Sequence, residues 1–251
     1  MRSPPPDVVA SWPRPNYINP ETQGPDLIIA GLITLIVALI TLVLRLYVRI
    51  RIIRQTGLDD WVMVAAGIFT TAATICIVLA FDRFGWRYHV WDLRPAMLIS
   101  GRKASFATQA FFVPATLLCK VSILLSYLRL APLNSWFRRL SLIAPWVVTA
   151  TTAAFWIVLF TECKPITSYW TLSRTKFDCI DETPVLFAYV ILSVIFDFFV
   201  WALPSPPSTA PTCLSTNVLL SLHSSALACL SSWPRASGFI IWILSCAKHM
   251  T

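Results

Sequence analysis

Charge is the scarcest property of this sequence. Of its 251 residues only 13% are charged, whereas soluble domains carry about a quarter. Hydrophobic residues make up 57% of the chain, and the mean hydropathy is +0.69. A water-soluble fold of this size could not bury so much apolar surface. The composition therefore excludes an ordinary soluble domain and indicates that most of the chain lies in lipid.

Sequence motifs of the common enzyme classes are also missing. The chain has seven glycines, and none belongs to a phosphate-binding cluster. No P-loop, GxGxxG, HExxH or GxSxG motif occurs. The three histidines stand too far apart to suggest a metal site, and no cysteine pair has CxxC spacing. We therefore predict no enzyme activity, no cofactor and no metal.

Uncharged or nearly uncharged runs of bilayer-spanning length recur along the chain. About 20 helical residues cross the roughly 30 Å hydrocarbon core. On this basis we predict an all-α, polytopic transmembrane bundle over residues 27–204, preceded by a proline-rich extracytoplasmic arm at 1–26. The expected helices span about 27–47, 61–81, 104–130, 140–161 and 184–203.

The composition changes after residue 204. Segment 205–251 contains no acidic residue, and serine becomes its main polar residue. One further apolar run, at about 213–233, is long enough to form a sixth helix. The sequence as written thus predicts about six spanning helices.

Arginines gather at the ends of two predicted helices. Arg45 lies in the last turn of the first helix, Arg49 and Arg51 follow it, and Arg129 closes the third helix. Most simply they are cytoplasmic anchors that face lipid phosphates; contact with a cytosolic signalling partner is the alternative. The net charge of +8 is concentrated beside apolar runs, so we predict a lipid bilayer rather than a nucleic acid as partner.

Two charged residues interrupt otherwise apolar helices. Lys120 lies in the third predicted helix and Asp197 in the fifth. If these helices are parallel, the rise of about 1.5 Å per residue places both groups within about 3 Å of the same depth. A charge in the bilayer needs a partner or water, so we predict an intramembrane pair. It could be a structural tie, a switch or an ion site; alternatively, Lys120 reaches the interface alone.

Two predicted loops on the same side of the membrane carry the remaining candidates. Cys163 and Cys179 lie in one extracytoplasmic loop, where thiols are oxidised, so a disulfide is a candidate; two free thiols are the alternative. His89 and Trp91 lie in the other loop. There we expect an interfacial histidine, with a sensing role as the alternative.

Several segments, in order, resemble one family of proteins. Arg45-Leu46-Tyr47-Val48-Arg49 ends the first helix, and Gly57-Leu58-Asp59-Asp60-Trp61 begins the second. Further matching segments are Gly85–Trp91, Lys120–Arg129, Cys163–Ile166 with Cys179, and Asp197-Phe198 with Leu203-Pro204. Together, over about residues 17–204, the chain resembles the fungal rhodopsin-like integral membrane proteins.

The resemblance implies a rhodopsin-like bundle of seven helices, with the N-terminus outside and no known catalytic activity. A retinal protein needs a lysine deep in its last helix, and none is found here. The family would continue with a basic inner loop where segment 205–251 begins. We therefore interpret this tail as the product of a shifted reading frame, a retained intron or a truncated gene model.

The function expected from this resemblance is receptor-like. An extracellular ligand of unknown identity, or a surface cue, would shift the packing of the helices, and cytoplasmic loops would report the change to a cytosolic partner. The expected location is the plasma membrane. The alternatives are a transporter or channel that uses Lys120 and Asp197, or a non-functional truncated family member.

Overall fold

A computed structural model describes residues 11–17, 22, 24–130, 136–171 and 178–203. Five long helices dominate it: α2 (Asp26–Tyr47), α3 (Leu58–Arg83), α4 (Pro95–Leu130), α5 (Trp136–Thr161) and α6 (Glu182–Ala202). The predicted sixth helix at about 213–233, and the rest of the tail at 205–251, lie outside the described residues. Within the described part, five helices are long and apolar enough to cross a membrane.

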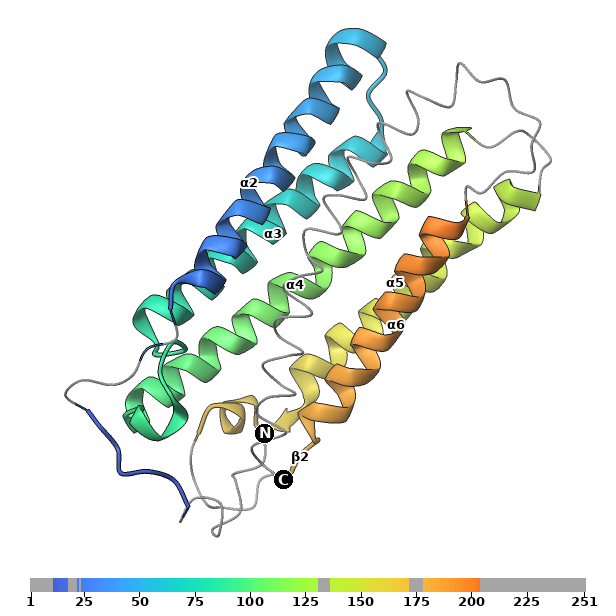
Figure 1. The fold of residues 1–251 in the computed structure, drawn as a ribbon. Helices are drawn as coiled ribbons and strands as arrows, with labels where there is room; N and C mark the ends of the chain where they lie inside the picture. The colour runs from blue at the N-terminus through green and yellow to red at the C-terminus, as the bar shows by residue number, and fades with distance from the viewer. Residues whose placement is uncertain (1–10, 18–21, 23, 131–135, 172–177, 204–251) are drawn as a thin grey trace.

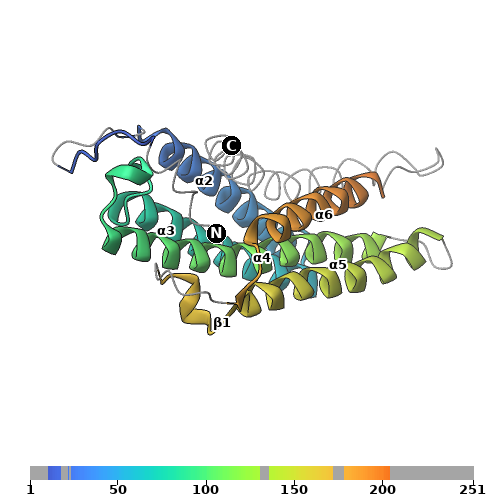
Figure 2. The same cartoon turned by 90° about the horizontal axis from the view of Figure 1, so that it is seen from below.

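The helices form two layers. α4 lies between α3 and α5, and α2 and α6 lie on the same side of this row (Figures 1 and 2). α2, α4 and α6 run in one direction, and α3 and α5 run in the opposite one (Figure 1). One end of the bundle carries the α2–α3 turn and the end of α4; we call it the arginine end. The opposite end carries a short antiparallel pair of strands, β1 (Cys163–Lys164) and β2 (Asp178–Cys179); we call it the disulfide end.

The largest differences from the predicted helix boundaries are at the start of α4 and after α2; the other ends of the five long helices lie within four residues of their predicted positions. α4 begins at Pro95, nine residues before the predicted start at 104, because proline suits the first turn of a helix and the polar residues after it do not prevent helix formation. After α2 the chain continues as a π-helix, η1 (Val48–Ile53), where we expected a loop. It ends at Arg54, whose φ of 52° is left-handed.

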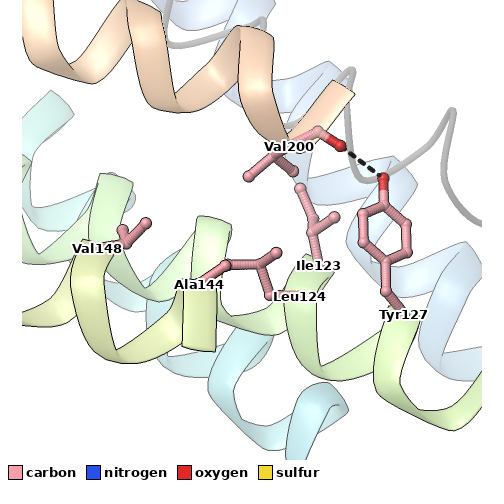
Figure 3. Close-up of a cluster of buried hydrophobic side chains, with 6 residues drawn as sticks. All are labelled: Ile123, Leu124, Tyr127, Ala144, Val148 and Val200. Atoms are coloured by element: carbon pink, nitrogen blue, oxygen red, sulfur yellow. Dashed lines mark hydrogen bonds between the residues drawn. The ribbon is translucent and has the colours of Figure 1, made fainter. Parts of the chain in front are cut away.

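Apolar side chains pack where α4, α5 and α6 meet near the arginine end. Ile123, Leu124 and Tyr127 of α4 contact Ala144 and Val148 of α5 and Val200 of α6 (Figure 3). The Tyr127 hydroxyl also donates a hydrogen bond of 3.2 Å to the Val200 carbonyl. This cluster fixes the three helices against one another at that end of the bundle.

Large apolar side chains also cover the outside of the bundle. On α2, Ile33, Ile36 and Val43 are each more than half exposed. Such an exterior is stable only against lipid, where backbone groups must be satisfied within helices. Trp61, Trp136 and Trp201, also exposed, lie at the ends of α3, α5 and α6 nearest the arginine end. They are placed as interfacial tryptophans usually are. The molecule is an integral membrane protein.

Candidate functional site

A buried ionic cluster occupies the arginine end. Asp59 and Asp60 begin α3, where carboxylates favour the positive end of the helix dipole. Arg45 of α2 places Nη2 3.3 Å from Asp59 Oδ2 and Nε 3.5 Å from Asp60 Oδ1. The three residues are 6%, 1% and 2% exposed, respectively. The end of α2 is thus tied to the start of α3 by fully desolvated charges.

The same carboxylates are bound from α4. Arg129 Nη1 lies 3.1 Å from Asp59 Oδ1, and Ser126 Oγ donates to Asp59 Oδ2 at 3.1 Å. Arg49 adds a longer contact of 3.5 Å to Asp59 Oδ2. We call Arg45, Arg49, Asp59, Asp60 and Arg129 the arginine–aspartate cluster. It joins three helices through two carboxylates.

This arrangement corrects the prediction that Arg45 and Arg49 face lipid phosphates. The left-handed Arg54 and the extended Gly57 turn the chain back, so that the aspartates meet the end of α2. Asp60 also caps α3 as expected, because its Oδ2 accepts the Gly57 N–H at 3.2 Å. Arg51 is exposed on η1 and lies outside the cluster, so its role as an anchor remains a prediction.

The structure brings Lys120 and Asp197 together. Lys120 Nζ of α4 lies 3.3 Å from Asp197 Oδ1 of α6. It also donates to the Ser193 carbonyl at 3.1 Å and to Ser193 Oγ at 2.6 Å. The three donors of the ammonium are therefore matched by three acceptors on one helix. α4 and α6 run in parallel, as the depth argument required.

The loop residues gather at the disulfide end. Cys163 and Cys179 form a disulfide across the β1–β2 pair, where they lie opposite each other. His89 and Trp91 stack at 4.6 Å between ring centroids with an interplanar angle of 3°. Asp92, which follows them, accepts the backbone N–H of Asn16 at 2.8 Å. The arm before α2 is thus held against the loop that carries His89.

Sequence reasoning did not identify a cavity that lies between the helices of the described part of the chain. It measures about 190 Å³ and is lined by residues of all five long helices, among them Gly31, Thr74, Gln109, Leu159 and Tyr189. Its wall is mostly apolar, as in small-molecule sites generally. It lies in the half of the bundle nearest the disulfide end.

Two acidic residues at the cavity, Glu162 and Glu182, also escaped the sequence analysis. Glu162 directly follows α5, and Glu182 begins α6; they are 4% and 7% exposed and both line the cavity. Their only sequence signal is a position at the end of an apolar run, where acidic residues are usually solvated. Only the folded loop shows that both are buried.

Burial changes the acid–base properties of this end. Burial and the neighbouring Glu182 carboxylate raise the pKa of Glu162 to about 7. Burial, together with the same carboxylate, raises the pKa of the Tyr169 phenol as well. Tyr169 remains a hydrogen-bond donor, and its hydroxyl donates to Glu182 Oε1 at 2.9 Å.

Comparison with known families supports the resemblance found in the sequence. The fungal rhodopsin domain matches residues 44–221, a range that starts and ends later than the predicted 17–204. No curated protein and no solved structure matches the chain significantly. Because the match covers more than half of the chain, this integral membrane protein belongs to the fungal rhodopsin domain family.

Proposed function

We propose that this protein is a membrane receptor in which occupancy of the cavity changes the packing of the helices. The observation that carries the proposal is that all five long helices contribute to the cavity wall. A ligand held there would contact every helix, so its binding energy would depend on their relative positions. A ligand with such differential affinity shifts the population of conformations.

The disulfide supports an orientation for the proposed receptor. Disulfides form and persist in oxidising compartments, so we propose that the end that carries Cys163 and Cys179 faces outward, and we propose the plasma membrane as the location. The arginine end then faces the cytosol. α4 spans from one end to the other and contributes both Gln109 to the cavity and Arg129 to the arginine–aspartate cluster. In this proposal α4 transmits the effect of a ligand in the cavity to a cytosolic partner at the arginine end.

The Lys120–Asp197 pair favours a receptor over a transporter. The ammonium has acceptors for each of its three donors, and the Lys120 side chain is only 6% exposed. A residue on a permeation path needs access to water and donors that a passing ion or substrate can use. In the receptor, this pair serves to hold α4 and α6 together.

Filling the cavity from the chain itself tests the proposal without a known ligand. A Cβ added at Gly31 meets no described heavy atom within 4 Å, so Gly31→Phe places a ring at the cavity wall, and Gly31→Ala is the matched control. We expect Gly31→Phe, but not Gly31→Ala, to change amide hydrogen exchange of residues 48–57 at the other end. Unchanged exchange in both variants would contradict the coupling.

The transporter alternative is tested separately. Lys120→Cys in proteoliposomes is treated with a membrane-impermeant thiol reagent on one side at a time, and the unsubstituted protein corrects for native cysteines. If the protein is a receptor, we expect the reagent to leave residue 120 unlabelled above that background when it is added to at least one of the two sides. Labelling from both sides would replace the receptor with a transporter or channel.

A further inference from the structure

The threonines in the wall of the cavity are hydrogen-bonded to their own helices. They are Thr34 on α2, Thr74 on α3 and Thr108 on α4. The Thr34 hydroxyl donates to the carbonyl three residues earlier at 3.0 Å. The hydroxyls of Thr74 and Thr108 donate to carbonyls four residues earlier, at 2.8 and 2.9 Å. Because a hydroxyl has one proton, none of the three has a proton left to donate to a ligand.

Polar side chains of α4 and α6 are hydrogen-bonded to each other beside the cavity. Gln109 Nε2 donates to Glu182 Oε1 at 3.1 Å, and the Tyr189 hydroxyl is hydrogen-bonded to Thr116 Oγ1 at 2.7 Å. Each of these bonds joins α4 to α6. A ligand that bound to the same atoms would have to break a contact between two helices, so these groups are poorly placed to hold a polar ligand.

The two acidic side chains of the wall also have partners within the chain. Glu182 Oε1 accepts a second hydrogen bond, from the Tyr169 hydroxyl at 2.9 Å, and Glu182 takes part in a further interaction. The positive charge of the chain's amino terminus acts on the Glu162 carboxylate. A cationic ligand would compete with these partners, and an anionic ligand would be repelled by Glu182. The wall therefore favours a ligand without charge.

Aromatic rings form much of the remaining wall. Phe81 packs edge-on against Trp86 with ring centroids 5.9 Å apart, and Phe155 packs edge-on against Tyr189 at 5.5 Å; all four line the cavity. Aromatic rings pack favourably against one another in edge-on and offset arrangements. The wall is therefore suited to a ligand that contains a ring.

The size of the cavity limits the ligand. An apolar cavity of about 150 Å³ holds one benzene ring, so a cavity of about 190 Å³ admits a ring with a short alkyl chain. Transfer of an apolar ligand from lipid to the cavity brings no hydrophobic gain, because lipid tails are equally apolar. The gain comes instead from filling a void whose wall atoms lack contacts on one side. Affinity should therefore depend on fit rather than on hydrophobicity alone.

We infer that the cavity binds an uncharged, apolar molecule about the size of one benzene ring with a short alkyl chain. The inference rests on the proposed function only in taking the cavity as the ligand site, and it adds the chemical class of the ligand. Such a molecule needs no hydrogen bond from the wall, whose polar groups keep their partners within the protein. Its affinity comes from close packing against the aromatic and aliphatic side chains.

A series of fluorinated probes tests both size and charge on the full chain in lipid nanodiscs. The probes are fluorobenzene, 1-fluoro-4-propylbenzene, 1-fluoro-4-nonylbenzene and 3-(4-fluorophenyl)propylammonium. Fluorine NMR of empty nanodiscs gives the signal of each probe dissolved in lipid. A second, saturable signal in nanodiscs that contain the protein reports binding.

The propyl probe should bind most tightly. Relative to its concentration in lipid, we expect an affinity about tenfold higher than that of each other probe, which corresponds to about 1.4 kcal/mol. Partition into lipid rises steadily with chain length, so a maximum at the propyl probe separates fit from partition. An affinity that follows partition, tighter binding of the ammonium probe, or no saturable signal for any probe overturns the inference.

Variants that fill the cavity locate the binding site. Val190 of α6 lines the cavity, and Val190→Phe should abolish the saturable signal of the propyl probe. Val185→Phe, at another wall position of α6, is the second variant if the first does not fold. Val43→Phe is the matched control, because it makes the same change on the outside of α2, where Val43 is 62% exposed. A signal that survives in a folded wall variant, or that is lost in the control, contradicts the inference.

Failure of this inference and failure of the receptor proposal give different results. The exchange experiment with Gly31→Phe uses no probe. If it shows coupling while the propyl probe does not bind, the receptor proposal stands and the ligand class is wrong. If the propyl probe binds as expected while exchange is unchanged, the ligand class stands and the receptor proposal is wrong.

Discussion

Buried acidic residues lie in different surroundings at the two ends of the bundle. At the arginine end, Asp59 and Asp60 are surrounded by three arginines from α2, η1 and α4. At the disulfide end, Glu162 and Glu182 share a cavity wall, and the described hydrogen bonds to Glu182 come from neutral groups. Acids held by arginines tie helices together, whereas the two glutamates lie beside a cavity to which all five long helices contribute. The difference separates a structural cluster from a candidate binding site.

The largest expected effect is at the arginine end. Asp59→Asn removes one of two carboxylates that serve three arginines, and it leaves buried positive charge uncompensated. Removing one partner of a buried ion pair costs about 3–5 kcal/mol, so we expect a much lower midpoint of thermal unfolding in detergent. Asp82→Asn, whose carboxylate is mostly exposed, should cost at most about 1 kcal/mol. Equal effects of the two variants would show that the cluster is not structural.

Substitutions in the Lys120–Asp197 pair, which lies between the two ends, should have an intermediate effect on the free energy of unfolding. Lys120→Asp or Asp197→Lys places two like charges together, and we expect each to lower the free energy of unfolding by about 1–3 kcal/mol. The Asp197 side chain is 36% exposed, so its loss is partly compensated by solvation. The double swap should recover much of the thermal stability. If it is no more stable than either single variant, the two residues are not energetic partners.

A smaller effect is expected from pH at the disulfide end. The folded protein raises the pKa of Glu162 from its ordinary 4.5 to about 7, so the folded state binds this proton more tightly than the unfolded state. Its contribution to stability is complete below about pH 4.5 and is lost as the pH rises through 7. We expect the unfolding midpoint to fall between pH 5 and pH 8, and more steeply than in Glu162→Gln. Identical slopes in the two proteins would contradict a buried, titrating Glu162.

The smallest effect on stability is expected at Gly57. The Arg129 guanidinium occupies the space where a Cβ at Gly57 would lie, so Gly57→Ala must displace Arg129 from Asp59. Because the displaced group is the end of a flexible side chain, we expect a cost of about 1 kcal/mol or less.

The local consequence at Arg129 should be larger than the change in stability. Limited trypsin digestion with mass spectrometry should show faster cleavage after Arg129 in Gly57→Ala than in the unsubstituted protein. Gly31→Ala, whose Cβ meets no described atom within 4 Å, is the control. Unchanged cleavage after Arg129 would mean that its contact with Asp59 does not order the end of α4.

Features that depend on distance along a single helix could be predicted from the sequence. The five spans follow from hydropathy, and the pairing of Lys120 with Asp197 follows from a constant rise per residue in parallel helices. The partners of Arg45 could not be predicted, because the position of Asp59 beside it depends on the turn through Arg54 and Gly57. Glu162 was missed for a similar reason: its burial requires the loop to fold over the end of α5.

The disulfide has a consequence for the two acids of the cavity. Glu162 immediately precedes Cys163, and Glu182 follows Cys179 by three residues. The covalent bond between the cysteines therefore sets the spacing of the carboxylates as well as the shape of the loop. A reducing environment would untether the two glutamates, so the oxidation state of the surroundings decides whether they act as a pair.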